Sequence, residues 1–217
     1  MIKHIIWDWN GTLYDDAEYG RYVINEVLKH FDMPVLPDLT AYRRIFCFPV
    51  RTFYHRVGLT DAVYDEGAEL WMKVYREKEH TVPLREHAES VVAALKQAGY
   101  TQAIVSASYL PALLSQVGQF PIVHILDDLC GLPDIHARSK VELAREYLSG
   151  KGYSPDETLF IGDSVHDAEV AGECGARCIL VSGGHQNDQT LQTSGCDILE
   201  DLSKIPQWLK NHGQDTP

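Results

Sequence analysis

An acidic residue directly after an apolar, strand-like run is the first feature of this chain that could do chemistry. Residues 5–13 read Ile-Ile-Trp-Asp-Trp-Asn-Gly-Thr-Leu, so Asp8 ends the run, and Gly11 and Thr12 follow in a turn. Open α/β sheets bind ligands at the carboxyl ends of their strands, where a carboxylate can act as a nucleophile. The Asn10 side chain cannot exchange a proton near neutral pH. The segment predicts nucleophilic chemistry at Asp8 without an acid or base at Asn10.

A pair of acids follows a later strand-like run. The apolar segment 159–161 leads into Gly162 and Asp163, and Asp167 comes four residues after Asp163. On a turn from a strand into a helix, two carboxylates at this spacing can converge on one hard cation, directly or through water. A single Gly-Asp at the end of a strand is common, so the pair gains its weight from its combination with Asp8.

A lysine and a serine occupy two more boundaries between elements. Lys140 falls in the first turn of a predicted helix, where a cation opposes the helix dipole unless a bound anion or a group of carboxylates balances it. Ser106 follows the apolar segment 102–105, and Ala107 and Ser108 come next. Taken alone, such a serine is usually a turn or cap residue, and such a lysine is usually solvated. Their order along the chain with the three acids favours one shared site.

Alternating helices and strands must position these residues. From residue 83 onward the pattern predicts helices at 86–98, 111–117, 139–149, 167–174 and 202–209, and strands at 101–106, 122–126, 158–161, 178–181 and 197–199. Such alternation implies right-handed crossovers and a parallel sheet with helices on both faces. We therefore expect an α/β fold with a doubly wound, Rossmann-like parallel sheet core, whose strand ends bring the candidate residues together.

A helical insertion interrupts this alternation. Residues 15–82 contain two helix-like periodic patterns where a short connection would be expected. We expect a core domain of residues 1–14 and 83–217, with an inserted α-helical cap domain of residues 15–82 over the strand ends. Closure of such a domain would exclude water from the site.

The middle of the insertion is rich in cations. Segment 42–56 contains four arginines among aromatic residues, in an otherwise acidic chain. Guanidinium groups bind carboxylates and phosphates well, so Arg43 and Arg51 are candidates for binding a substrate anion. The alternative, which is the commoner role of such arginines, is pairing with surface acids.

The charge of the chain limits its partners. The 217 residues carry a formal net charge of -12 without a basic patch, which argues against nucleic acid as a partner. The apolar run at residues 1–7 is too short for a signal peptide, and no stretch approaches the ~20 apolar residues of a membrane span. The five scattered cysteines form no C-x-x-C pair and are expected to be reduced. We expect a cytoplasmic protein with no membrane contact.

These motifs together resemble those of the haloacid dehalogenase superfamily, in their order along the chain. The matching residues are Asp8 with Gly11 and Thr12, then Ser106, then Lys140, and last Asp163 with Asp167. The resemblance covers the core before residue 15 and from residue 83 to about residue 184, with the insertion in the position called C1, and it is most similar to the phosphoglycolate phosphatase branch. The chain departs from the phosphatase pattern at Asn10, where a second Asp serves as acid and base.

The resemblance implies a Mg²⁺-dependent phosphatase that hydrolyses a small anionic phosphorylated metabolite through an aspartyl phosphate. Asp8 would be the nucleophile, with Ser106 and Lys140 on the phosphoryl oxygens. The remaining implied roles are metal binding by Asp8, the backbone carbonyl of Asn10, Asp163 and Asp167, and substrate binding by Gly11, Thr12 and Ala107. We expect a monomer or homodimer.

Asn10 leaves alternatives open. General acid–base help is worth about 10² to 10⁴ in rate, so hydrolysis needs a good leaving group, a replacement for the missing acid, or a phosphoenzyme that persists. The candidate replacements are Asp15, Asp16, His166 and His185. A catalytically impaired phosphometabolite-binding or regulatory module is a second interpretation. A dehalogenase or phosphonatase is a third, although the metal-binding acids disfavour the former, and the absence of Lys from segment 42–56 disfavours the latter.

Overall fold

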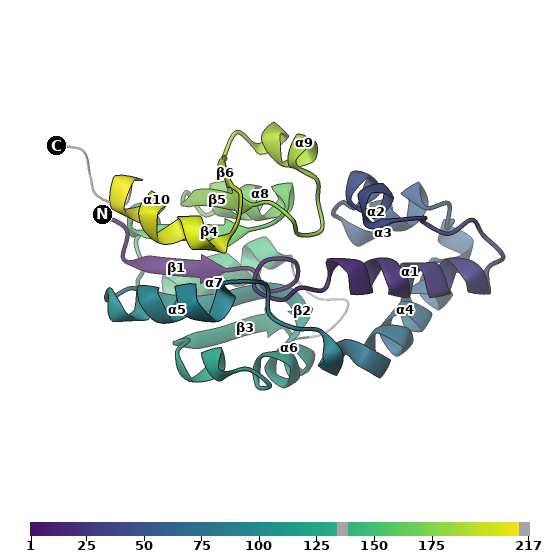
Figure 1. The fold of residues 1–217 in the computed structure, drawn as a ribbon, viewed down its shortest axis with the longest axis horizontal. Coiled ribbons are helices and arrows are strands. Elements are labelled where there is room, and N and C mark those ends of the chain that lie inside the picture. The colour runs from purple at the N-terminus through teal and green to yellow at the C-terminus, as the bar shows by residue number, and fades with distance from the viewer. Residues whose placement is uncertain (134–138, 213–217) are drawn as a thin grey trace.

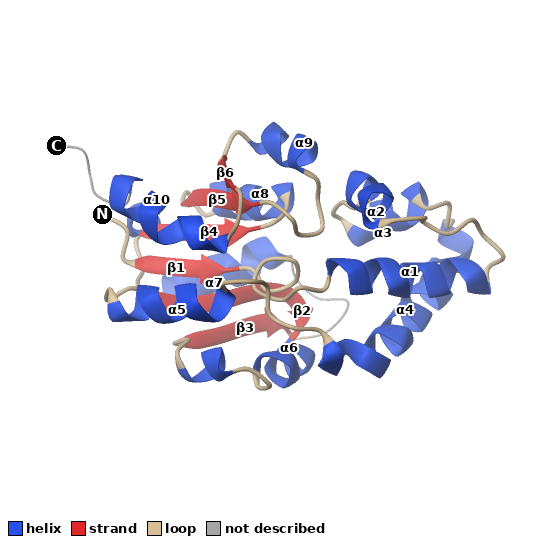
Figure 2. Cartoon of the chain, in the orientation of Figure 1, coloured by secondary structure: helices blue, strands red, loops and turns tan. Residues whose placement is uncertain are grey.

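Six parallel strands form a single sheet, in the order β3-β2-β1-β4-β5-β6 (Figure 2). The computed structural model describes residues 1–133 and 139–212. The strands are β1 (His4–Trp7), β2 (Thr101–Tyr109), β3 (Asp128–Leu132), β4 (Thr158–Gly162), β5 (Arg177–Val181) and β6 (Asp197–Leu199). The chain builds outward from β1 to β3 and then returns to place β4 on the other side of β1. Sheets with such a reversal usually bind their ligands outside the carboxyl ends of the strands on its two sides, which are β1 and β4 here.

Helices cover both faces of the sheet, as predicted (Figure 1). They are α5 (Ala88–Gln97), α6 (Leu110–Val117), α7 (Lys140–Lys151), α8 (Val165–Glu173), α9 (Asp188–Leu191) and α10 (Ile205–His212). Alternate residues of β1 face opposite layers: Ile5 and Trp7 pack in the cluster that includes α5, α6 and α10, whereas Ile6 packs with α7 and α8. Burial on both faces explains the uninterrupted apolar run before Asp8.

The strand predicted at 122–126 is wrong. Residues Pro121–His124 form a 3₁₀ turn, and the strand follows at Asp128–Leu132. Ile122 is fully buried in the core, so the apolar signal comes from a turn that packs beneath the sheet. The actual strand is an edge strand that begins with an acid, and Asp128 pairs with Lys151 of α7. Its side chains are mostly half-buried, which weakens the strand pattern.

The inserted residues form a helical unit beyond the carboxyl ends of the strands (Figure 1). Its helices are α1 (Ala17–His30), α2 (Leu39–Ile45), α3 (Val50–Arg56) and α4 (Tyr64–Lys78). Side chains of α1, α2 and α3, among them Val27, Tyr42 and Phe53, pack into an apolar cluster of their own. Within the described part of the chain, no helix combines the length and apolar character needed to cross a membrane.

Candidate active site

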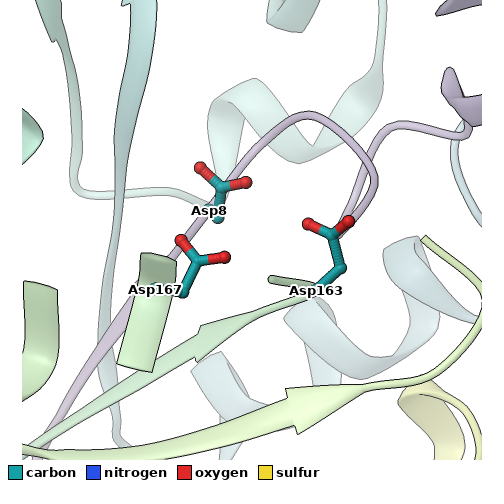
Figure 3. Close-up of side chains that lie close together, drawn as sticks. All are labelled: Asp8, Asp163 and Asp167. Carbon is teal, nitrogen blue, oxygen red and sulfur yellow. The ribbon is translucent and has the colours of Figure 1, made fainter. Parts of the chain in front are cut away.

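Three carboxylates meet at the carboxyl ends of β1 and β4. Asp8 follows β1, Asp163 follows β4, and Asp167 lies in the first turn of α8. Their ligand oxygens lie within 4.8 Å of one another, and the three carboxylates face a common space (Figure 3). Asp163 and Asp167 are buried, while 13% of the Asp8 side chain is exposed. The structure thus brings together the acids that the sequence places at separate strand ends, with Asp8 the more accessible of the three.

Lys140 is the buried cation of this group. It is the first residue of α7, and its Nζ lies 2.5 Å from Asp8 Oδ1 and 2.5 Å from Asp167 Oδ1. Against the effect of burial, the charges of Asp167 and Asp8 raise the pKa of the ammonium group above its ordinary value. The two carboxylates therefore balance the unfavourable position of a cation at a helix N-terminus.

The pKa values of the three carboxyl groups are shifted in different directions. Burial, together with the charges of Asp167 and Asp163, raises the pKa of Asp8 to about 7 despite the opposing charge of Lys140. Burial also raises the pKa of Asp163, whereas Lys140 and Ser164 overcome burial and lower the pKa of Asp167. Three carboxylates and one ammonium leave a net negative site made of hard oxygen donors. This donor set fits a divalent cation such as Mg²⁺.

Neighbouring groups orient the two acids after β4. Thr12 Oγ1 donates to Asp163 Oδ1 at 3.0 Å, and the backbone N–H of His185 donates to Asp163 Oδ2 at 2.6 Å. The backbone N–H and hydroxyl of Ser164 donate to Asp167 Oδ2 at 3.1 and 2.7 Å, which caps α8. These hydrogen bonds hold each acid in a fixed direction.

Gly162 is required by the close approach of Asp167. A Cβ at position 162 would lie well inside van der Waals contact of Asp167 Cβ and Cγ, and that side chain is held by Lys140 and Ser164. We expect Gly162→Ala to lower kcat at least about tenfold and to destabilise the protein by about 1–3 kcal/mol. Steady-state kinetics and urea unfolding measure both effects.

Gly172→Ala is the matched control. Gly172 lies on the exposed side of α8, and a Cβ there meets no atom within 4 Å. It should leave kcat unchanged and stabilise the protein by up to about 1 kcal/mol, since alanine is the better helix former. Equal effects of the two substitutions would contradict the assigned packing at Gly162.

The Asn10 side chain forms its hydrogen bonds with Asp16, Tyr75 and Ser108, and not with the cluster of Asp8, Asp163 and Asp167. Its Nδ2 donates to Asp16 Oδ2 at 2.8 Å and to the Tyr75 hydroxyl at 3.2 Å, and its Oδ1 accepts from Ser108 Oγ at 2.7 Å. His185 Nε2 reaches Asp16 Oδ1 at 3.0 Å. Two of the four candidate replacements for the missing acid, Asp16 and His185, therefore lie beside Asn10.

The other two candidates lie elsewhere. Asp15 is exposed, and its backbone N–H donates to the carbonyl of Pro83. His166 Nδ1 lies 3.2 Å from Glu169 on the same helix, and its ring stacks on Phe48. Neither side chain joins the network around Asn10.

His185 is held between the insertion and the core. Its Nδ1 lies 2.8 Å from the Tyr42 hydroxyl of α2, opposite the contact with Asp16. Although burial opposes it, the negative charges of Asp16 and Asp163 raise the pKa of His185 to about 9. The ring is therefore an imidazolium at neutral pH. The sequence pattern did not indicate that Tyr42 contacts His185 or that Tyr75 contacts Asp16. An aromatic residue in a helix is ordinarily assigned to the apolar core.

The candidate residues after β1 and within β2 have hydrogen-bond partners in the protein. Thr12 contacts Asp163 directly, and the carbonyl of Gly11 accepts from Arg85 Nη1 at 2.9 Å. Ser106 is buried, and its Oγ accepts from the backbone N–H of Ser108 at 3.1 Å, with Ala107 half-buried between them. Ser106 therefore stabilises the turn that follows it, as such serines commonly do. Its contact with a phosphoryl group stays a prediction.

The two arginines chosen as substrate ligands have protein partners. Arg43 Nε donates to the carbonyl of Gly184 at 2.7 Å, and its Nη2 donates to the carbonyl of Gly183. Arg51 pairs with Asp61 at 2.9 Å and lies 4.2 Å from the Tyr64 ring centroid. Arg43 thus joins the insertion to the loop after β5, and Arg51 has the surface pairing considered above. No contact described for either guanidinium reaches the carboxylate cluster.

Fold and site together define a class, an α/β enzyme with a carboxylate–lysine site at the carboxyl edge of a parallel sheet. Within that class, the chain belongs to the haloacid dehalogenase-like hydrolases, whose family model matches residues 5–181. The resemblance drawn from the sequence motifs is confirmed.

Curated relatives and solved structures agree with this family. A phosphoglycolate phosphatase of Haemophilus influenzae is 23% identical over 94% of this chain and 97% of its own, and one of Pasteurella multocida is 27% identical over the same shares. A haloacid dehalogenase-like hydrolase from Streptococcus pneumoniae has a TM-score of 0.84 at 19% identity, covering 96% of this chain and 98% of its own. CbbY from Rhodobacter sphaeroides, solved with phosphate, has a TM-score of 0.73 at 19% identity, covering 94% and 96%.

Proposed function

We propose that the protein is a Mg²⁺-dependent phosphatase that hydrolyses a small phosphomonoester of the phosphoglycolate type through an aspartyl phosphate. The observation that carries the proposal is the position of Lys140, which bridges the accessible Asp8 and the buried Asp167 beside Asp163. This arrangement holds a nucleophile, a cation for phosphoryl oxygens and a divalent-metal donor set in one place. Phosphoglycolate phosphatases among the curated relatives, and phosphate in CbbY, support the substrate class.

Each residue has a distinct part in the proposed reaction. Asp8 attacks phosphorus in line, and the bond from phosphorus to the alcohol oxygen breaks. The leaving alkoxide takes its proton from solvent water, because Asn10 cannot donate one. Water then cleaves the aspartyl phosphate, which releases orthophosphate and regenerates the Asp8 carboxylate. Lys140 and the Ser106 hydroxyl balance the charge on the phosphoryl oxygens. Asp8, the Asn10 carbonyl, Asp163 and Asp167 would hold Mg²⁺, which offsets the repulsion between the acids and a phosphate dianion.

The insertion supplies the surroundings of this chemistry. We propose that residues 15–82 act as a cap that closes over the strand ends, excludes water and selects the substrate. The acidic chain acts on a free metabolite in the cytoplasm, as a monomer or homodimer. A panel of phosphate esters, assayed with Mg²⁺, tests the substrate class, and failure to hydrolyse any ester would contradict the proposal.

Metal dependence gives a second test. Because the pKa of Asp8 is raised from 3.8 to about 7, the metal-free folded state keeps a proton that the unfolded chain loses, and its stability falls as pH rises through that window. Mg²⁺ needs the ionised carboxylate, so its stabilising effect should grow over the same window. We expect about 2.7 kcal/mol of stabilisation at a Mg²⁺ concentration 100 times its Kd.

Urea unfolding with and without Mg²⁺ at several pH values measures this effect, and EDTA should abolish turnover. Hydrolysis of a chlorinated acid that survives EDTA would instead support a dehalogenase. The network around Asn10 also favours a second candidate, a phosphometabolite-binding module, because the side chain in the acid–base position is fully occupied by protein partners. Calorimetric binding of orthophosphate without turnover of any ester would support that candidate.

A further inference from the structure

The amide of Asn10 has one arrangement in this network. The amide nitrogen donates to Asp16 Oδ2 and also lies within hydrogen-bond distance of the Tyr75 hydroxyl, and the carbonyl oxygen accepts from the Ser108 hydroxyl. A flipped amide would place its carbonyl oxygen against the carboxylate of Asp16. The orientation of Asn10 is therefore set by the charge of Asp16.

Asp16 is in turn surrounded by donors. It is 2% exposed, and its Oδ1 accepts from the backbone N–H of Gly11 at 2.8 Å and from His185 Nε2 at 3.0 Å. Its Oδ2 accepts from Asn10 Nδ2 at 2.8 Å and from the Tyr75 hydroxyl at 2.7 Å. Four donors around one carboxylate favour its ionised form.

These partners come from three parts of the chain. Gly11 and Asn10 belong to the turn after the nucleophile, Tyr75 belongs to α4 of the insertion, and His185 follows β5. Asp16 itself lies in the insertion, directly before α1. His185 also contacts Tyr42 on α2, so Asp16 is linked to two further helices of the insertion, α4 and α2. The buried carboxylate of Asp16 thus joins the turn after Asp8 to α4 and to the loop after β5.

We propose that Asp16 carries the carboxylate that position 10 lacks, and that Asn10 and Asp16 form a matched amide–carboxylate pair which positions the insertion over the nucleophile. This role rests on the proposed phosphatase function, and it makes Asp16 a positioning residue. The family pattern has Asp at position 10, so restoring it would be expected to raise activity. The pair predicts the opposite: an acid introduced at position 10 alone lies against the Asp16 carboxylate and disables the site.

A cycle of exchanges tests the pair. Asn10→Asp sets two carboxylates against each other, and Asp16→Asn leaves one amide oxygen to serve donors that now use two carboxylate oxygens. Combining N10D with D16N restores one acid and one amide in exchanged places. We expect each single variant to lower kcat/KM at least tenfold and to lower the unfolding temperature, with the double variant recovering both. The expected coupling in kcat/KM is about tenfold or more, within the range of contacting groups.

The measurements are kcat and KM on the best ester and thermal unfolding for all four proteins. Asp156→Asn, which makes the same chemical change at an exposed acid far from the network, is the control and should behave as the wild type. Tyr75→Phe is a milder variant that removes one donor to Asp16, and it should raise KM or lower kcat while the protein stays folded. Refolding of the double variant, if a single variant does not fold, supports the pair.

The outcomes separate the ideas. A gain of activity in N10D alone, or additive effects on both stability and kcat/KM, overturns the proposal. Coupling in stability with additive effects on kcat/KM overturns the positioning role, because Asp16 would then be structural only. If no ester is hydrolysed by any of the four proteins, the phosphatase function fails, while the stability cycle still decides whether the pair exists.

Discussion

Asp8→Asn should reduce kcat for every phosphate ester at least about 10³-fold, the largest kinetic effect expected of any substitution in the chain. The amide keeps the size of the carboxylate but has no nucleophilic oxygen, so an aspartyl phosphate cannot form. The change also removes one negative charge from a site that holds three carboxylates against one ammonium. The metal-free variant should therefore be no less stable than the wild type.

Single-turnover assays and mass spectrometry of acid-quenched protein measure this prediction. The wild type should gain the mass of one phosphoryl group during turnover, and the variant should not. Orthophosphate binding by the variant shows that the site is intact, because Lys140 remains. Turnover above one hundredth of the wild-type rate would mean that a water molecule, rather than Asp8, attacks phosphorus.

Lys140→Met should have the largest combined effect on stability and rate. The side chain is almost completely buried, and its removal leaves Asp8 and Asp167 without their shared cation. Breaking a buried ion pair on one side costs about 3–5 kcal/mol, and losing a group that stabilises transition-state charge costs about 10²–10³ in kcat. Because the remaining carboxylates repel one another, Mg²⁺ or a lower pH should restore part of the stability.

Lys151→Met, on the same helix, is the control for Lys140. Lys151 is partly exposed and pairs with Asp128 on the edge strand, so its loss should change stability by about 1 kcal/mol or less and leave kcat unchanged. Urea unfolding and initial rates measure both variants. A similar loss for the two lysines would show that the cluster does not depend on its buried cation.

The strand-end acids and the parallel core could be predicted from the sequence, because both depend on local patterns. An apolar run that ends on an acid predicts a buried strand with the acid at its carboxyl end, and Asp8 lies at that end of β1. The edge strand at 197–199 also has the predicted bounds. The strand after residue 126 was misplaced because its side chains are half-buried, while the more apolar turn before it is buried beneath the sheet.

The network around Asn10 could not be predicted in the same way. Tyr75 lies 59 residues from Asp16 in sequence, and Tyr42 lies 143 residues from His185. Contacts at such separations depend on how the insertion docks on the core, and no periodicity in either segment records that docking. Asp16 and His185 were each candidates from the sequence. The hydrogen bonds that join both His185 and Asn10 to the Asp16 carboxylate appear only in the folded chain.

The loop after β5 joins the insertion to the cluster of acids. The carbonyl of Gly184 accepts from Arg43 of α2, and the next N–H along the chain, that of His185, donates to Asp163. A displacement of α2 therefore acts on the orientation of a proposed cation ligand through a single peptide unit. Under the proposed cap function, substrate admission and cation affinity would be reciprocally linked: a change that opens the insertion would weaken cation binding, and a bound cation would favour the closed arrangement by the same free energy.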